Sequence, residues 1–412
     1  MRRAVITGIG VVSPLGAPDL SVFWERIREG RSGIGPIKRF DASDYASRIA
    51  GEVIEFDIDA FIPKKEQRRL DPFSHYAMAA AKLAISDSGI DTHTEIPERM
   101  GAIVGSGIGG LQTLQAQHVI LMNKGPSRCS PFMIPQMICN IASGLIAIEH
   151  NLKGPNYAVV SACATAAHGI GDAMRLIQRN DADIMIAGGS EAAVCELGIG
   201  GFSSLRALST RNDEPKKASR PFDADRDGFV MAEGAGIVLV EEMERAQKRG
   251  AQIYCEVAGF GMTCDAYHMT APDENGDGAA NAMKLAIQDA GVEPDQIDYI
   301  NAHGTSTALN DKIETMAIKT ALGNDQARKT MISSTKSMTG HLLGAAGGIE
   351  TAICALALRD GVVPPTINYD TPDPECDLDY VPNTAREAKI EVCLNNSLGF
   401  GGHNACLLLK KI

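Results

Sequence analysis

The chain has 412 residues, a formal net charge of −12 and 44% hydrophobic residues. Its length and apolar content suffice for a large core, and its acidic balance argues against nucleic acid or an anionic membrane as a partner. The 10 cysteines contain no CxxC pair and no metal-ligand spacing, so we predict neither a disulfide framework nor a zinc site. The N-terminus enters a strand-like run without a signal-peptide pattern, which indicates a soluble protein of the cytoplasm.

Apolar runs that end in glycine predict strands, and apolar stripes with a helical period predict helices. In the first half, the expected strands are residues 3–12, 100–104, 183–189 and 236–240, and the expected helices are residues 21–28, 72–88 and 241–249. Gly89 is a suitable C-cap for the Ala-rich helix 72–88.

Gly105, Gly107 and Gly110 have the GxGxxG spacing of a dinucleotide-binding loop. No acidic residue follows a second strand about 20 residues later, as such a site requires. We therefore interpret these glycines as a place where backbone segments pack closely.

The chain is organised around residues 158–171, Ala-Val-Val-Ser-Ala-Cys-Ala-Thr-Ala-Ala-His-Gly-Ile-Gly. The β-branched run predicts the end of a buried strand, and a helical period begins after it. Cys163 then lies beside a helix N-terminus, where the helix dipole and free N–H groups are expected to lower the pKa of its thiol below about 8.5. The alternative is a structural cysteine, which is the usual role of a buried cysteine.

From residue 253 the pattern of the first half starts again. Residues 257–261, 279–290, 297–304 and 331–358 resemble, in order, the first strand, the helix before Gly89, the strand 100–105 and the Cys163 element. This similarity predicts a duplicated α/β unit, with one half over residues 1–250 and the other over residues 251–412. We expect a layered α/β fold in which loops from both halves converge on one site.

Polar clusters follow several predicted strands. They are Ser161-Ala-Cys163, the run from Asn301 to Thr307, the run from Lys336 to His341, and residues 395–404. One cysteine and two histidines, His303 and His341, on convergent loops indicate a thiol-nucleophile site. The histidines interpreted as structural are His75, His93, His118 and His150, and His168 and His403 are left without a role.

These clusters carry a resemblance that extends from the first strand to the last. The runs that carry it are Ser161-Ala-Cys-Ala-Thr, Asn301-Ala-His-Gly-Thr-Ser-Thr, Lys336-Ser-Met-Thr-Gly-His and Gly399-Phe-Gly-Gly. The chain resembles the elongating β-ketoacyl-[acyl-carrier-protein] synthases of the thiolase superfamily, those of type II most closely. The resemblance implies a five-layered αβαβα fold, a homodimer, acyl carrier protein as partner, and decarboxylative Claisen condensation in fatty-acid elongation, with no cofactor.

The resemblance also implies roles for single residues. Cys163 is the implied nucleophile, which holds the acyl chain as a thioester. His303 and His341 are the implied donors to the malonyl thioester oxygen, where negative charge develops during decarboxylation. The backbone N–H groups of Cys163 and Phe400 are the implied oxyanion hole for acyl transfer, and Phe400 is the implied gate. Lys336 is expected to maintain the electrostatics of the site.

Further positions carry over from the same resemblance. Glu350 is the expected buried partner of Lys336 or His341. The implied acyl and pantetheine contacts are Ile108, Phe202, Thr270, Thr305 and Thr307. The implied carrier-protein docking residues are Lys65, Arg68, Arg69, Arg128 and Arg206. No catalytic metal is implied, but the family pattern leaves room for a structural monovalent cation near Asn301, Glu350 and Asn396.

Other classes of protein fit these residues less well. A degradative thiolase uses a second cysteine as base, and an initiating synthase pairs cysteine and histidine with asparagine. A cysteine hydrolase requires one Cys–His pair with an orienting Asn or Asp, not two histidines and a lysine. A non-catalytic partner subunit, like the chain-length factors of polyketide systems, lacks the nucleophile that Cys163 supplies.

Overall fold

The computed structural model describes residues 2–16, 19–54 and 56–412. Strands of both halves join in one sheet. The first half supplies β1 (Ala4–Val12), β4 (Met100–Gly105), β5 (Asn156–Tyr157), β6 (Ile184–Glu191) and β7 (Gly234–Glu242). The second half supplies β8 (Cys255–Cys264), β9 (Tyr299–Asn301), β10 (Met331–Ser333), β13 (Val392–Gly399) and β14 (His403–Lys410).

The order of the strands demonstrates the duplication. Across the sheet it is β10-β9-β13-β14-β8-β1-β7-β6-β4-β5, so each half has the same arrangement outward from its first strand. The directions match as well, because the two pairings next to β1 and β8 are antiparallel and the two outer pairings are parallel in both halves. The halves meet where Ala4, Val5 and Ile6 of β1 pair antiparallel with β8.

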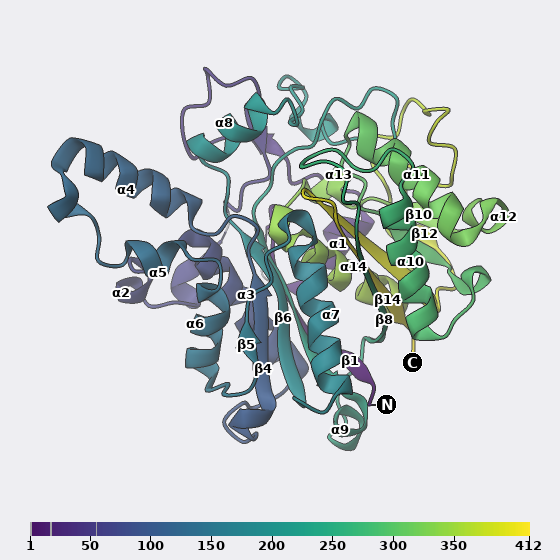
Figure 1. The fold of residues 1–412 in the computed structure, drawn as a ribbon, viewed down its shortest axis with the longest axis horizontal. Coiled ribbons are helices and arrows are strands. Elements are labelled where there is room, and N and C mark those ends of the chain that lie inside the picture. Colours follow the sequence, from purple (N-terminus) through teal and green to yellow (C-terminus); the bar gives the residue numbers. More distant parts are fainter. Residues whose placement is uncertain (1, 17–18, 55) are drawn as a thin grey trace.

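Helices cover the sheet in three layers. The outer layers are α3 (Pro72–Ser88) with α6 (Ile141–His150), and α10 (Asp277–Ala290) with α11 (Ala308–Leu322); the inner layer is α7 (Thr165–Gln178) with α14 (Ala346–Asp360). Figure 1 shows α3 and α6 on one side of the molecule and α10 and α11 on the other.

Buried side chains alternate along the strands because neighbouring residues point to opposite faces of a sheet. In β7, Ile237 packs beneath α3 while Val238 faces the inner helices. In β14, Leu407 faces the inner helices while Leu408 packs beneath α10. The half of the sheet from β1 to β5 and the half from β8 to β10 thus act as two β layers, although β1 and β8 join them at one edge. These two layers separate three large apolar cores, which is the predicted five-layered αβαβα fold.

Shorter elements complete the described chain. The remaining α-helices are α1 (Leu20–Arg28), α2 (Lys64–Gln67), α4 (Leu111–Lys124), α5 (Met133–Met137), α8 (Glu196–Ser204), α9 (Met243–Lys248), α12 (Asn324–Ala327) and α13 (Lys336–Thr339). The 3-10 turns are η1 (Ile58–Ala60), η2 (Pro97–Arg99), η3 (Pro126–Arg128), η4 (Ala162–Ala164), η5 (Pro215–Lys217), η6 (Pro294–Gln296) and η7 (Leu343–Ala345). Two small sheets pair β2 (Gly35–Pro36) with β3 (Ile49–Ala50), and β11 (Val362–Val363) with β12 (Arg386–Glu387). No helix in the described ranges is long and apolar enough to cross a membrane.

Several sequence predictions are confirmed at the level of single residues. The Asp71 side chain caps the N-terminus of α3, and Gly89 ends the helix in the left-handed conformation with φ of 68°. The GxGxxG glycines serve close packing, since a Cβ on Gly105 would lie 2.1 Å from the carbonyl oxygen of Val159.

One expected element is different in the structure. The run before Cys163 is not the end of a buried strand: β5 is a two-residue edge strand that ends at Tyr157, and Val160 is 53% exposed. Edge strands are paired on one side only, so β-branched residues at such a position need not be buried. The division of the chain at residue 250 remains a prediction.

Candidate active site

Cys163 lies on a strained turn before α7. Cys163 is in the middle of η4, and Ala162 before it has φ of 50°, a left-handed conformation that costs energy for any residue but glycine. The Thr165 hydroxyl stabilises this turn, since it accepts a hydrogen bond from the N–H of Ser161 at 2.9 Å and donates one to the carbonyl of Ala162 at 2.8 Å.

The pKa of the Cys163 thiol differs from the sequence prediction. Burial raises the pKa to about 12, although the Lys336 ammonium and the N–H of Phe400 act in the opposite direction. The predicted lowering by the helix terminus is therefore wrong, because the loss of hydration outweighs it. Near neutral pH the side chain of Cys163 is therefore a neutral thiol.

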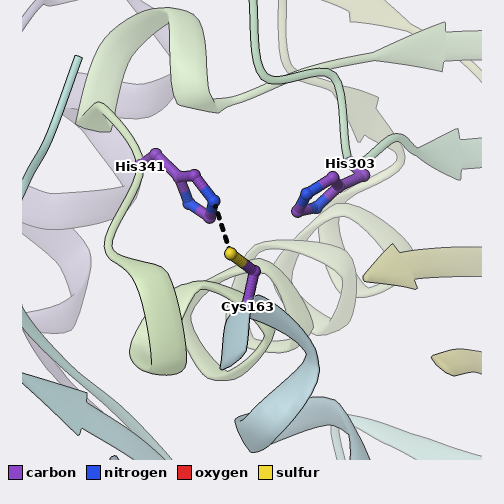
Figure 2. Close-up of side chains that lie close together, drawn as sticks. All are labelled: Cys163, His303 and His341. Atoms are coloured by element: carbon purple, nitrogen blue, oxygen red, sulfur yellow. Dashed lines mark hydrogen bonds between the residues drawn. The ribbon is translucent and has the colours of Figure 1, made fainter. Parts of the chain in front are cut away.

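His341 and His303 lie on either side of the thiol (Figure 2). The Nε2 atom of His341 is 3.1 Å from Sγ of Cys163, and Nδ1 of the same ring accepts the N–H of Leu343 at 3.3 Å. Because Nδ1 accepts, the ring proton is on Nε2, which points toward the sulfur. The two imidazole rings are nearly perpendicular, at 84°, with centroids 5.3 Å apart.

Lys336 fixes the tautomer of the second histidine. Its Nζ lies 3.4 Å from Nδ1 of His303, and it forms an ion pair with the carboxylate of Glu350. An ammonium has only protons to offer, so Nδ1 of His303 accepts and Nε2 carries the proton. The structure thus confirms Glu350 as the partner of Lys336, and both side chains are buried.

Both imidazoles are neutral. Burial, and then the charge of Lys336, hold the pKa of His303 and of His341 well below 6.5. The Sγ atom and one nitrogen of each ring lie within 4.8 Å of one another. Two neutral N–H donors therefore converge on the position in front of the sulfur, where a substrate oxygen can be placed.

Two buried carboxylates near the site were absent from the sequence predictions. Glu314 of α11 accepts the N–H of His303 at 2.8 Å and that of Gly304 at 2.7 Å, and burial raises its pKa to about 7. Glu191 accepts N–H groups from two loops beside the site. The only signal for Glu191 in the sequence is a charged residue at the end of an otherwise apolar strand.

A cavity of about 580 Å³ opens in front of Cys163. Of the predicted residues, it is lined by Cys163, His303, His341, Phe400, Ile108, Phe202, Thr270, Thr305 and Thr307. Lys336 is not part of the lining and acts from behind His303. The Phe202 ring lies between Phe229 and Phe400, with centroid distances of 5.5 and 6.4 Å. The structure thus brings the predicted substrate-contact residues to one cavity.

The predicted docking residues are all exposed but are not one cluster. Arg206 lines the mouth of the cavity, and the other four do not. Arg69 lies 5.0 Å from the ring centroid of Phe132, and the carbonyl of Arg68 accepts a hydrogen bond from Gln136 of α5. The basic residues after α2 therefore lie beside α5.

Oxygen atoms near Glu350 are without hydrogen-bond donors. Among the described residues, buried oxygens of Asn301, Glu350, Asn395 and Ser397 have no partner. Asn301 and Asn395 are neighbours in the parallel register, and Asn395 donates to Gly347 of α14, so this face of the sheet meets the helix that carries Glu350. The Asn396 side chain, also with an unpartnered oxygen, lies on the opposite face.

The architecture and the site define a class of protein: an α/β thiolase-type fold in which a buried thiol from one repeat meets two histidines from the other. Sequence profiles of the β-ketoacyl synthase family match two ranges of the chain, the N-terminal domain at residues 1–246 and the C-terminal domain at residues 254–370. The chain belongs to the β-ketoacyl synthase family.

Individual relatives agree over the full length. The chain is 55% identical to the 3-oxoacyl-[acyl-carrier-protein] synthase 2 of Synechocystis sp. over 410 residues, covering 100% of this chain and 98% of that protein. It is 53% identical to the synthase of the same name from Coxiella burnetii, covering 100% and 99%. A polyketide ketosynthase solved with its acyl carrier protein superposes with a TM-score of 0.92 at 35% identity, covering 100% and 99%.

Proposed function

We propose that Cys163, His303, His341 and Lys336 carry out the two half-reactions of a condensing enzyme at the 580 Å³ cavity. The chain is an acyltransferase of the 3-oxoacyl-[acyl-carrier-protein] synthase II type, which elongates acyl chains in fatty-acid biosynthesis. The observation that carries the assignment of roles is the convergence of two Nε2–H donors on one thiol.

In the first half-reaction, the sulfur of Cys163 attacks the carbonyl carbon of the acyl thioester on the carrier protein. The C–S bond to the carrier breaks, and the carrier thiol leaves with a proton, so the Cys163 proton is transferred in the same exchange. Since the pKa of Cys163 is about 12, this proton is lost during the attack and not before it. The N–H groups of Cys163 and Phe400 stabilise the oxyanion.

In the second half-reaction, malonyl-carrier protein enters and its carboxylate leaves as CO₂. The electron pair of the broken bond forms an enolate whose oxygen accepts hydrogen bonds from Nε2–H of His303 and His341. The enolate carbon then attacks the acyl thioester, and Cys163 leaves as the thiol after it takes up a proton. Neutral imidazoles suit this step, because their N–H groups stabilise the negative charge on the enolate oxygen by hydrogen bonding and do not transfer the proton to it.

Exposed basic side chains on the surface are the proposed binding site for the carrier protein that brings the substrate. The exposed side chains of Lys65, Arg68, Arg69, Arg128 and Arg206 have no ion-pair partner among the residues that the structure describes. Basic side chains that are free to pair suit an acidic carrier, and Arg206 stands at the mouth of the cavity. Thr305 and Thr307, whose hydroxyls are 3.0 Å apart, are placed to contact the pantetheine arm.

A homodimer accounts for apolar surface on the first half. Figure 1 shows α4 projecting from the body of the molecule, and none of its described residues is buried. Met122 is 71% exposed, Ile148 of α6 is 80% exposed, and Val160 beside the edge strand β5 is 53% exposed. Exposed apolar side chains on elements near an open sheet edge fit pairing with a second copy.

The unpartnered oxygens beside Glu350 fit a monovalent cation. Asn301, Asn395 and Ser397 would hold it with Glu350, and the cation would offset the carboxylate charge that Lys336 neutralises only at one oxygen. We expect the midpoint of thermal unfolding to fall when sodium and potassium are replaced by choline. We also expect a cytoplasmic location, in line with cysteines that are all free in the structure.

Intact-protein mass spectrometry tests the function. Wild type and Cys163→Ala are incubated with dodecanoyl-carrier protein, and then with malonyl-carrier protein. We expect an acyl adduct on wild type only, and its loss with release of a β-ketoacyl product when malonyl-carrier protein is added. Wild type that takes up no acyl group would instead indicate a non-catalytic partner subunit.

A further inference from the structure

The two repeats build the same turn before their inner helices. In the first repeat, Ala162 has φ of 50° and Cys163 follows it, two residues before α7 begins at Thr165. In the second repeat, Leu343 has φ of 49° and Gly344 follows it, two residues before α14 begins at Ala346. Gly344 is therefore the counterpart of the nucleophile, in a turn with the same exposed backbone N–H groups.

In the second repeat a side chain of the protein occupies this turn. Glu191, at the end of β6, is completely buried. Its Oε2 accepts the N–H of Gly344 at 3.0 Å and that of Gly107 at 2.8 Å. Its Oε1 accepts the Ser106 hydroxyl at 2.6 Å and the N–H of Ile108 at 3.2 Å.

All four donors to Glu191 are neutral, so the carboxylate is held by dipoles in the way an oxyanion hole holds a charged oxygen. Burial raises the pKa of Glu191, and the four donors oppose that rise. The turn at Gly344, which corresponds to the turn at Cys163, is thus occupied by the carboxylate of Glu191 from the first repeat.

The donors belong to two of the segments that line the cavity. Ile108 and Leu343 both line it, and their backbones are in contact, since a Cβ on Gly344 would lie 2.4 Å from the nitrogen of Gly107. The Ser106 hydroxyl also accepts the N–H of Gly109 at 2.9 Å, which extends the arrangement through the whole turn. On the other segment, the N–H of Leu343 fixes the tautomer of His341.

We propose that Glu191 is a positioning residue that holds the Ile108 wall of the cavity against the turn at Gly344, and thereby sets the preference for acyl-chain length. The proposal rests on the proposed function, because Ile108 matters only if the cavity receives an acyl chain. A glutamine at position 191 has one acceptor oxygen, and its NH₂ group would face a backbone N–H. One of the two segments is then released, and the wall at Ile108 can move away from a longer chain.

The test compares two substrates on one enzyme. The rate of acyl transfer to Cys163 is measured by intact mass with hexanoyl- and dodecanoyl-carrier protein, for wild type and Glu191→Gln. We expect the dodecanoyl-to-hexanoyl ratio of kcat/KM to rise about tenfold in the variant. A merely structural role would lower both rates together and leave the ratio unchanged.

Glu241 provides a matched control. It is also a completely buried carboxylate at the end of a strand, but it binds Thr7, Arg245 and Arg249 and is remote from the cavity lining. Glu241→Gln is expected to lower stability and to keep the wild-type ratio. An equal change of ratio in both variants, or an unchanged ratio in Glu191→Gln, overturns the proposal.

Ser106→Ala keeps the test decisive if Glu191→Gln does not fold. It removes one of the four donors to Glu191, so we expect the dodecanoyl-to-hexanoyl ratio of kcat/KM to rise about threefold. An unchanged ratio overturns the proposal. The wild-type measurements distinguish failure of the proposed function from failure of the role proposed for Glu191. Wild type that is not acylated by either substrate refutes the proposed function, whereas wild type with a clear preference that Glu191→Gln and Ser106→Ala retain refutes only the role of Glu191.

Discussion

The Nε2 atom of His341 lies 3.1 Å from Sγ of Cys163, although 178 residues separate the two in the chain. The thiol belongs to the first repeat, and the imidazole belongs to the second. The site is therefore assembled from both repeats, while Leu343 and Lys336 set the tautomers of the two rings from behind.

Replacing one imidazole donor should separate the two half-reactions. In the proposed mechanism His341 donates a hydrogen bond to the enolate oxygen, so we expect His341→Ala to lower malonyl decarboxylation about 10²- to 10³-fold. Acylation of Cys163, for which the proposed oxyanion hole is formed by the N–H groups of Cys163 and Phe400, should fall much less. CO₂ release and intact mass report the two steps. His93→Ala, at an exposed position, serves as control, and equal losses in both steps would contradict the assignment.

The reactivity of Cys163 should depend on pH over an unusually high range. Because burial raises its pKa to about 12, the thiolate fraction is small near neutral pH and increases tenfold per pH unit up to that value. Alkylation by iodoacetamide, followed at the Cys163 peptide, should therefore keep accelerating above pH 9. A plateau between pH 7 and 8 would show a thiolate stabilised by the helix terminus.

Glu314 should make the protein less stable as pH rises toward 8. Its pKa is raised to about 7 in the folded state, against about 4.3 in the unfolded chain, so the protonated form favours folding. This stabilisation is complete below the unfolded pKa and is lost as pH rises through 7. Between pH 5 and 8, wild type should lose about 2 to 3 kcal/mol more free energy of unfolding than Glu314→Gln. The free energy of unfolding is measured by urea titration at each pH. An equal loss between pH 5 and 8 in the two proteins would refute this.

The apolar surface beside β5 should be sensitive to charge. Val160 is 53% exposed in the single chain, and a lysine there would be placed at the proposed dimer contact. We expect Val160→Lys to shift the molar mass measured by light scattering from dimer to monomer. Ile96→Lys, at a residue that is 63% exposed elsewhere, should remain dimeric. If wild type is a monomer, the homodimer proposal is wrong.

Charge reversal beside α5 should weaken docking of the carrier protein. The double variant Arg68→Glu, Arg69→Glu is expected to raise KM for acyl-carrier protein about tenfold and to leave the reaction with a small-molecule thioester unchanged. The effect should shrink at high salt, because exposed charges are screened. Lys389→Glu, at an 86% exposed side chain, is the matched control. An equal effect on the small thioester would place the defect in the site itself.

Much of the fold is visible in the sequence because it rests on local patterns. The helix at Pro72–Ser88 and the strands before Gly105 and Gly189 are apolar, regular and bounded by glycine, so their positions and the duplication could be predicted. The helix at Leu111–Lys124 was not predicted; it contributes no buried residue to the chain, so it lacks the clear one-sided apolar stripe of a core helix.

The chemistry of the site was predictable only in part. The identities of Cys163, His303 and His341 follow from short motifs, but the pKa of the thiol depends on how completely the fold buries it. Spacing along the chain does not contain that information. Glu191 and Glu314 were missed because only the fold shows which backbone N–H groups they accept. The donors to Glu191 lie 84 and 153 residues away, and those to Glu314 lie in the loop 10 and 11 residues before it.

The pairing of β1 with β8 has a consequence for the chain as a whole. The connection between the repeats passes through exposed Gly250, so cleavage there would leave two fragments that can still recognise each other along a shared sheet edge. One fragment carries Cys163, the proposed nucleophile, and the other carries His303 and His341. In the proposed mechanism neither fragment turns over substrate alone, so turnover recovered on mixing would count reassembled molecules directly, as in a split reporter enzyme.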